Sequence, residues 1–346
     1  MKENIISRGI KRSAMVALTL LLAGNGQSYA QAATYNKGER LCDCCGKSLV
    51  NYDDATRKAW KELDGQLTFF MANDLGRNGY YEQKPIAELM GEMADVIGPK
   101  CILAIGDVHH FNGVASTHDP LWITNYELIY SHPELMIDWL PVCGNHEYRG
   151  NTQAVLDYGQ VSRRWVMPAK YYTRVYKKKG TTVRLVFLDT TPLIDKYRKD
   201  TETYPDAAKQ DMEAQLKWLD QTLGQAREDW VIVLGHHPMY AYTDKSETER
   251  LDMQKRVQAI LRKYHNVSIY ASGHIHNFQH FKMKGDDIDY VVNSSASLAR
   301  PVEAVEGTVF CSPAEGFAVF SVDKKQLRMS LINKNGQVLH TITRTK

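Results

Sequence analysis

The chain has 346 residues, of which 43% are hydrophobic and 24% charged, an ordinary globular composition with enough apolar side chains for a large core. Its formal net charge of +3 is small for this length and gives no support for nucleic-acid binding. Beyond the N-terminal region, no apolar run is long enough to cross a bilayer.

The first thirty residues have the pattern of a secretory signal peptide. Four lysines or arginines precede a short apolar run at residues 14–24, and Ser28 and Ala30 place small residues at the two positions that a signal peptidase reads. We expect cleavage after Ala30; an uncleaved membrane anchor is the alternative. The mature protein is therefore predicted to be exported, either periplasmic or secreted, with no stable membrane anchor.

Residues 31–65 read as a polar lead-in that carries cysteines and one helical stretch. Cys42, Cys44 and Cys45 lie close together, and in an oxidising compartment a disulfide is favoured over a zinc knuckle, because no second CxxC pair or nearby histidine supports a zinc site. The sequence does not single out a partner for Cys311.

From residue 66 to residue 346 the pattern predicts one catalytic domain in which strands and helices alternate. Strands are expected at residues 67–72, 101–105, 140–143, 230–234 and 267–271, helices at 84–97, 134–139, 206–223 and 249–264, an antiparallel pair at 171–175 and 183–188, and further strands from residue 290 onward. This order predicts an α/β fold with two packed mixed β-sheets flanked by helices.

Cys101 and Cys143 lie in the core strands and are expected to be buried thiols. The aromatic residues Trp122, Tyr126, Tyr130 and Trp139 are expected in the core.

Polar residues follow directly after five of the predicted core strands. They are Asp74, Asp107, Asn145 with His146, His236, and the pair His274 and His276. Ligands of α/β sheets bind at the carboxyl ends of the strands, so these side chains are expected at one edge. Carboxylate, amide and imidazole groups together suit divalent or ferric ions.

This set of residues fits a phosphoesterase with two metal ions, which could be Fe, Zn or Mn. Two ions can clamp a phosphate ester while a metal-bound hydroxide attacks phosphorus. Asp107 is central enough to bridge both ions, and His146 could stabilise the phosphoryl oxygens or protonate the leaving group, which makes these two the predicted catalytic residues.

Simpler interpretations exist for single members of the set. An aspartate after a strand is often a turn or helix cap, which is the alternative for Asp74. His274 and His276 are harder to explain in this way, because alternation along an extended segment places both on one face. Glu147 is expected only to support His146 as a hydrogen-bond acceptor.

Five stretches of the sequence resemble, in order, the motifs of calcineurin-like metallophosphoesterases: NDLG, GDVHH, GNHE, GHHP and GHIH, at residues 73–76, 106–110, 144–147, 235–238 and 273–276. From about residue 67 to the C-terminus the chain is most similar to the small purple acid phosphatases of the tartrate-resistant type. The resemblance implies the four-layer α-β-β-α sandwich of that superfamily.

The resemblance also implies a role for each matching residue. Asp74 and His276 would hold a first metal, normally ferric; Asn145, His236 and His274 would hold a second, normally divalent; Asp107 would bridge the two, and His146 would contact the substrate phosphate.

Two positions depart from the family pattern. The tyrosine whose phenolate binds ferric iron and gives the purple colour is replaced by His110. We therefore expect His110 to be a metal ligand, the colour to be absent and the first metal not to be ferric. His109 is expected to point to the opposite side. The family's further substrate-facing histidine after GHHP is also absent, and His237 or Lys245 could compensate for it.

The sequence thus predicts a metal-dependent hydrolase of phosphate monoesters that acts on small or phosphoprotein substrates and does not bind nucleic acid. Two alternatives remain: a phosphodiesterase or nucleotide hydrolase on the same site, and a non-catalytic metal-binding interaction protein. The physiological substrate, the metal identities and the oligomeric state are left open.

Overall fold

The computed structural model describes residues 40–41, 48–49 and 52–346. The predicted signal peptide and the cysteines at positions 42, 44 and 45 lie outside these residues. Strands β1 (Arg40–Leu41) and β2 (Ser48–Leu49) form a two-stranded antiparallel sheet. A separate compact unit runs from Ala55 to Lys346. Within the described ranges, no helix combines the length and apolar character needed to cross a membrane.

One sheet of the large unit has six strands in the order β15-β14-β13-β3-β4-β5. Strands β3, β4 and β5 are parallel to each other, whereas β13 runs antiparallel to β3 and begins a meander with β14 and β15. Their bounds are Leu67–Ala72 (β3), Ile102–Ile105 (β4), Trp139–Val142 (β5), Gly316–Val322 (β13), Gln326–Asn333 (β14) and Val338–Thr345 (β15).

The other sheet has seven strands in the order β12-β10-β11-β9-β8-β7-β6. The central strands β7, β8, β9 and β11 are parallel, and β6, β10 and β12 pair antiparallel. Their bounds are Tyr172–Lys178 (β6), Thr181–Leu188 (β7), Trp230–Gly235 (β8), Val267–Ser272 (β9), Phe278–Lys282 (β10), Asp289–Val292 (β11) and Thr308–Ser312 (β12).

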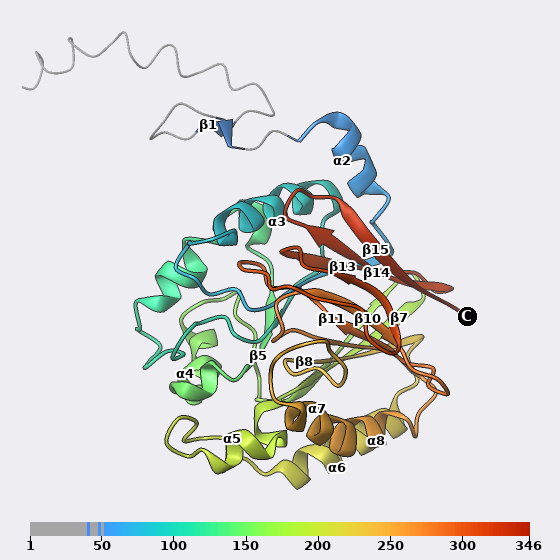
Figure 1. The fold of residues 1–346 in the computed structure, drawn as a ribbon. Helices are drawn as coiled ribbons and strands as arrows, with labels where there is room; N and C mark the ends of the chain where they lie inside the picture. The colour runs from blue at the N-terminus through green and yellow to red at the C-terminus, as the bar shows by residue number, and fades with distance from the viewer. Residues whose placement is uncertain (1–39, 42–47, 50–51) are drawn as a thin grey trace, which may run out of the picture. The chain divides into compact units, whose positions relative to one another are not determined.

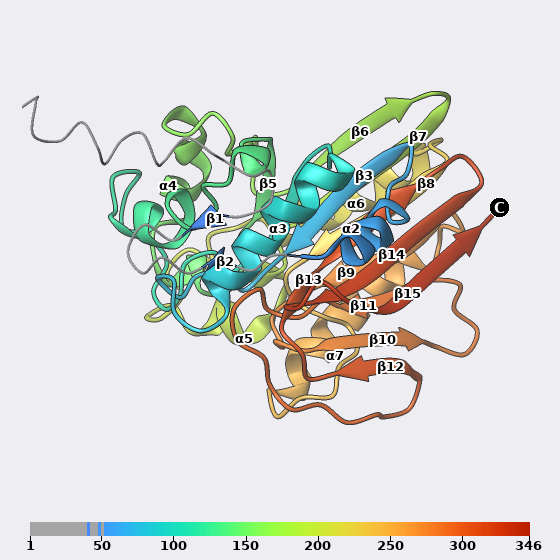
Figure 2. The ribbon, with the colours of Figure 1, turned by 90° about the horizontal axis from the view of Figure 1, so that it is seen from above.

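The two sheets pack face to face with helices on the outside, as Figures 1 and 2 show. Helix α3 covers the six-stranded sheet, and α6, α7 and α8 cover the seven-stranded sheet. The helices are α2 (Asp54–Lys61), α3 (Gln83–Ile97), α4 (Thr152–Asp157), α5 (Asp195–Lys199), α6 (Met212–Gln225), α7 (Glu247–Met253) and α8 (Ala259–Leu261), with 3₁₀ turns at Pro133–Leu135, Glu147–Arg149, Tyr158–Gln160 and Thr191–Leu193 and π-helical turns at Trp122–Glu127 and Gln254–Gln258. The predicted α-β-β-α sandwich is confirmed.

The central strands are buried because both of their faces are covered. Every residue of β3, β8 and β9 is buried, which explains why these strands read as continuous apolar runs rather than alternating ones. Trp122, Tyr126, Tyr130 and Trp139 pack edge to face in the core, as expected. Cys101 and Cys143 are buried free thiols, also as expected.

Some predicted helices have different bounds in the structure. Residues 134–139 form a 3₁₀ turn followed by the start of β5, because Trp139 pairs with Ile102 of β4. The helix predicted at residues 206–223 begins only at Met212, since the Asp211 side chain accepts a hydrogen bond from Ala214 N (2.9 Å) and caps it there.

Asp189, which follows β7, gives the fold a predicted pH dependence. Burial raises the pKa of Asp189 to about 7, although the hydroxyl of Tyr148 donates to its carboxylate. An unfolded aspartate titrates near 3.9, so the folded state binds more protons between about pH 4 and pH 7 and loses stability as the pH rises through that window. Asp189→Asn keeps an acceptor for Tyr148 and cannot ionise. In this variant the free energy of unfolding should therefore not show the fall of up to about 1.4 kcal/mol per pH unit that we expect for the wild type in this window. Urea unfolding of both proteins from pH 4 to pH 8 measures the difference; parallel curves would show that Asp189 is ionised when folded.

Candidate metal centre

The candidate ligands lie where five parallel strands end. Asp74 follows β3, Asp107 follows β4, Asn145 and His146 follow β5, His236 follows β8, and His274 and His276 follow β9. Strands β3, β4 and β5 belong to one sheet and β8 and β9 to the other, so the two sheets contribute to one site. The structure thus brings together every residue that the sequence proposed.

The backbone at four of these positions has a conformation that non-glycine residues rarely adopt. The φ angles are 52° at Asp74, 53° at Asp107, 72° at His274 and 66° at His276. Left-handed backbone at such residues costs free energy and is typical of functional sites, where the surrounding structure enforces it. Here it turns the chain sharply at the strand end and directs the side chains inward.

Two glycines allow the strands to approach each other at the site. A Cβ atom on Gly144 would lie 2.2 Å from Asp107 Oδ1, and one on Gly106, whose φ is 84°, would lie 2.5 Å from His236 Nδ1. Any larger residue at either position would displace a candidate ligand.

One group of side chains consists of Asp74, His110 and His276. Their ligand atoms lie within 4.8 Å of one another, and all three residues are buried. His276 Nε2 is 3.0 Å from Asp74 Oδ1. His109, by contrast, packs edge-on against Trp122 with ring centroids 4.4 Å apart, so it points away from this group, as predicted.

A second group is formed by Asp107, His236 and His274. Asn145 directly precedes His146, whose backbone N–H donates to Asp107 Oδ1 (2.9 Å). His236 Nε2 lies 3.1 Å from Asp107 Oδ2 and 3.3 Å from His274 Nδ1. Asp107 Oδ2 is also 3.5 Å from Nε2 of His110, a member of the first group. Asp107 therefore stands between the two groups, in the place expected of a bridging carboxylate.

The residues present fit a pair of cations. Ligand atoms bonded to one metal at about 2.0–2.2 Å lie roughly 3.0–3.5 Å apart. The pairs His276–Asp74, His236–Asp107 and His236–His274 have such spacings, at 3.0, 3.1 and 3.3 Å. Among the described residues, Asn145 Oδ1, His276 Nδ1 and both ring nitrogens of His110 are buried without a hydrogen-bond partner. Buried polar atoms in folded proteins nearly always have partners, so this concentration of unpaired donor and acceptor atoms points to a ligand.

The electrostatics of the site favour positive charge. Burial alone would raise the pKa of Asp107, but the neighbouring histidines, His236 first, hold it well below its usual range. Burial would likewise lower the pKa of His236, yet Asp107 raises it to about 9. A buried carboxylate that stabilises a protonated imidazole in this way would stabilise a metal cation by the same interaction.

Backbone and side-chain contacts orient the candidate ligands. His236 Nδ1 lies 2.9 Å from the Ile105 carbonyl oxygen and donates to it, which leaves Nε2 facing the site. The Asn73 amide donates to Asp74 Oδ2 (2.7 Å), which also accepts from His274 N (2.8 Å). These contacts fix the side-chain orientations before any metal binds.

Glu147 has a different role from the one predicted. Its carboxylate accepts hydrogen bonds from the backbone N–H groups of Asp107 (2.8 Å), Gly144 (2.7 Å) and His109 (3.1 Å), and not from the His146 ring. The expectation that it supports His146 is wrong, because the 3₁₀ turn that begins at Glu147 directs this side chain under the Asp107 turn.

Glu249 is a contributor that sequence reasoning missed. Its Oε2 lies 3.0 Å from His274 Nε2, and its Oε1 lies 2.6 Å from Lys196 Nζ. His274 can thus donate from Nε2 to Glu249, which leaves its Nδ1 facing His236. The only signal was an acidic residue in the predicted helix at residues 249–264, which is common on helix surfaces.

Glu249→Gln is expected to weaken binding of the metal held by His274 by about 10–100-fold, because the carboxylate no longer orients the imidazole and raises its basicity. Competition titration with zinc measures the affinity. Lys196→Met is the matched control, since it removes the contact to the other carboxylate oxygen only. Equal losses of zinc affinity in the two variants would contradict a specific role for the Glu249–His274 contact.

Of the two residues that could replace the family's missing histidine, the structure favours Lys245. Its ammonium lies 2.9 Å from the His274 carbonyl oxygen and within 3.2 Å of both ring nitrogens of His274. His237 also lies beside the second group, with its ring centroid 4.4 Å from that of His274. Its two ring nitrogens are engaged by Thr190 Oγ1 (2.8 Å) and Tyr197 Oη (3.1 Å).

Comparison with known proteins gives a consistent result. The family model described as calcineurin-like phosphoesterase matches residues 67–278. Purple acid phosphatase 3 of Arabidopsis thaliana is 30% identical over 292 residues, 81% of this chain and 78% of the relative. Human tartrate-resistant acid phosphatase type 5 is 27% identical over 73% of this chain and 81% of its own length.

Two solved structures share the fold. One is GAP50 of Plasmodium, described as the anchor in the inner membrane complex, with a TM-score of 0.69 and 20% identity over 81% of this chain and 88% of that one. The other is a dimetal phosphatase from Danio rerio, with a TM-score of 0.55 and 14% identity over 82% of this chain and 99% of that one.

Proposed function

Because the chain belongs to the calcineurin-like phosphoesterase family and, within it, to the purple acid phosphatases, we propose that it is a dinuclear metal-dependent phosphatase that hydrolyses phosphate monoesters. The observation that carries the proposal is the position of Asp107 between two convergent groups of buried ligand-type side chains. From the N-terminal sequence, we also propose that it acts outside the cytoplasm.

In this proposal the two groups hold the metals. Asp74, His110 and His276 would bind one ion, Asn145, His236 and His274 the other, and Asp107 both. The pair would supply Lewis acidity toward the phosphate and an activated water nucleophile.

His146 is our proposed substrate-contacting residue. Its Nδ1 is 2.6 Å from the Phe111 carbonyl oxygen and donates to it, while Nε2 faces the centre, 3.8 Å from Asp107 Oδ2. In the imidazolium form, Nε2 can donate to a phosphoryl oxygen or protonate the departing ester oxygen. His146 Nε2 is therefore our candidate for the general acid.

Positive side chains around the centre support a monoester over a diester. Lys245 is half-buried beside His274, and desolvation lowers its pKa to about 8, so its ammonium persists at acid and neutral pH. The buried Arg77 guanidinium also interacts favourably with Asp74 and Asp107. A terminal phosphate carries up to two negative charges and a diester only one, so added cations favour the monoester.

The test uses the full mature chain reconstituted with zinc, manganese or iron. We expect 4-nitrophenyl phosphate to be hydrolysed with a higher kcat/KM than bis(4-nitrophenyl) phosphate. A preference for the diester would favour the phosphodiesterase alternative, and no hydrolysis of either substrate by the metal-loaded protein would favour a non-catalytic binding protein.

A further inference from the structure

Five exposed lysines gather at the end of the sandwich opposite the candidate metal centre. They lie at the end of β6 with the turn that follows it, and in the turn between β13 and β14. The two turns belong to different sheets, but they adjoin, because Lys324 Nζ donates to the Gly180 carbonyl oxygen (3.3 Å). The five residues therefore form one surface, which we call the lysine end: Lys177, Lys178, Lys179, Lys324 and Lys325.

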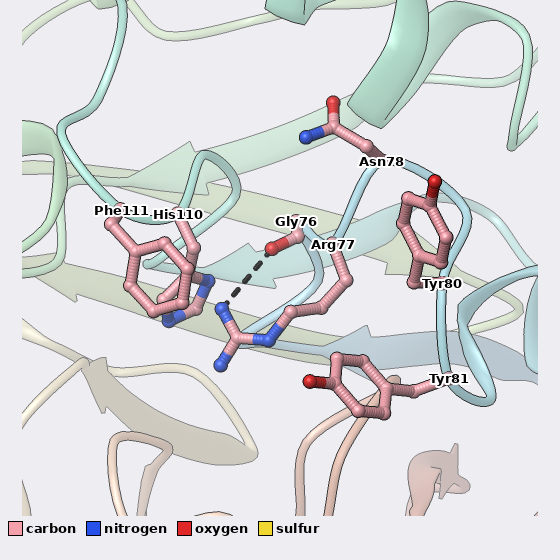
Figure 3. Close-up of a pocket in the computed structure, with 7 residues that line it drawn as sticks. All are labelled: Gly76, Arg77, Asn78, Tyr80, Tyr81, His110 and Phe111. Carbon is pink, nitrogen blue, oxygen red and sulfur yellow. Dashed lines mark hydrogen bonds between the residues drawn. The ribbon is translucent and has the colours of Figure 1, made fainter.

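The strand directions place the lysine end far from the metal centre. The candidate ligands follow the carboxyl ends of the parallel strands, as does the pocket drawn in Figure 3, which contains His110. The lysine end lies at the amino ends, since Lys178 pairs with Thr181 at the start of β7 and Val322 pairs with Leu67 at the start of β3. Figure 2 shows the β6–β7 turn and the C-terminus together at that end. Strand β7 has 8 residues, so the two ends are roughly 25 Å apart.

The positive charge of the lysine end is not balanced by its neighbours. Among residues 52–346, none of the five lysines forms an ion pair with a carboxylate. Two half-buried aspartates lie at this end and are already engaged: Asp229 pairs with Lys346 (2.9 Å), and Asp323 accepts a hydrogen bond from Gln66 N (3.0 Å). A cluster of unpaired like charges opposes folding by self-repulsion, so an anionic partner outside the chain would stabilise it.

The rest of the predicted mature chain has no excess of positive charge. The predicted signal peptide at residues 1–30 contains four basic residues and one acidic residue, so residues 31–346 hold 39 of each kind and are formally neutral. Five positive charges at one end therefore leave a net charge of −5 on the remainder. Such a separation of charge would orient the molecule near an anionic surface, with the lysine end toward it.

Protection of a sheet edge explains only part of the cluster. Strand β6 is an edge strand of the seven-stranded sheet, and lysines on edge strands discourage pairing with other chains. Lys324 and Lys325, however, connect β13 and β14, which are both interior strands of the six-stranded sheet. These two lysines protect no edge, whereas an anionic partner accounts for all five.

We propose that the lysine end binds the surface of an anionic phospholipid membrane and holds the protein there with its metal centre facing away. Lysine ammonium groups are point charges on flexible stems, which suit a diffuse layer of headgroups better than one phosphate held in a fixed geometry. Each lysine near an anionic bilayer strengthens binding about fivefold. Attachment of this kind is reversible and weakens with salt. It does not depend on the proposed phosphatase activity.

The test is sedimentation of the full mature chain with vesicles of phosphatidylcholine, either alone or mixed with phosphatidylglycerol. We expect binding to the mixed vesicles only, and its loss in about 1 M salt, where the screening length is about 3 Å. The triple variant Lys177→Gln, Lys178→Gln and Lys179→Asn should bind the mixed vesicles roughly 100-fold more weakly than the wild type. Asparagine is chosen at position 179 because φ there is 50°, a conformation that asparagine tolerates.

The matched control removes the same charge from exposed positions on α5, α6 and the π-helical turn after α7: Lys199→Gln, Lys217→Gln and Lys255→Gln. It should keep nearly the full affinity of the wild type for the mixed vesicles. Equal binding of the wild type to the two kinds of vesicle, or equal losses in the two triple variants, would overturn the proposal. Binding to soluble heparin without binding to the mixed vesicles would overturn it as well, and would assign the lysine end to a soluble polyanion.

Discussion

Asp107→Asn is expected to lower kcat/KM for 4-nitrophenyl phosphate by about 10³-fold or more, equivalent to roughly 4 kcal/mol of transition-state stabilisation. Asparagine has nearly the same volume, but it removes the negative charge that lies between His110 and His236. The same variant should bind fewer than two metal ions per chain, because both groups lose their shared anionic ligand. Steady-state kinetics and elemental analysis measure the two effects.

Asp287→Asn serves as the control, since that aspartate side chain is 79% exposed and its Oδ2 lies 3.8 Å from the ring of His265, which is also exposed. It should retain full metal content and activity. Retention of two metals and near wild-type turnover by Asp107→Asn would contradict the bridging role.

His110→Tyr is expected to turn the iron-loaded protein purple, whereas the iron-loaded wild type stays without that colour. The purple colour of the family comes from a tyrosine phenolate bound to ferric iron, and here an imidazole stands at that position, 3.5 Å from Asp107 Oδ2. The tyrosine variant should also retain ferric iron more tightly. Visible absorption spectra and iron quantitation after dialysis measure both.

Charge balance gives the physical reason. With a tyrosinate, three anionic ligands face a ferric and a divalent ion, which leaves a net charge of +2. With His110, only Asp74 and Asp107 are anionic, so two divalent ions restore the same +2, and a ferric ion would leave an additional charge in a buried site. We therefore propose two divalent metals in the wild-type protein.

His110→Phe is the matched control for the colour, because it has a ring of similar size and no phenolate. It should bind iron weakly and remain colourless. A wild-type protein that already shows the purple band, or a tyrosine variant that binds ferric iron without it, would disprove the proposed role of position 110.

The ordered motifs were enough to predict the sandwich and to select the residues that converge, because strand ends are a local property of the sequence. Asp74, Asp107 and His236 each follow an apolar run directly, and parallel strands bring such residues to one edge.

Contacts between distant elements could not be read in this way. Glu249 contacts His274 from α7, and Lys245 contacts it from the loop before α7. Both contacts depend on how α7 packs on the seven-stranded sheet. Glu147 was assigned the wrong partner, because its orientation is set by a 3₁₀ turn that the sequence pattern did not reveal.

The most direct test of the two-metal account is a crystal structure of the zinc-loaded mature protein with anomalous difference maps recorded at the zinc edge. The account predicts two peaks about 3.5–4 Å apart, with one carboxylate oxygen of Asp107 within bonding distance of both. A single peak, or two peaks that Asp107 does not bridge, would contradict it.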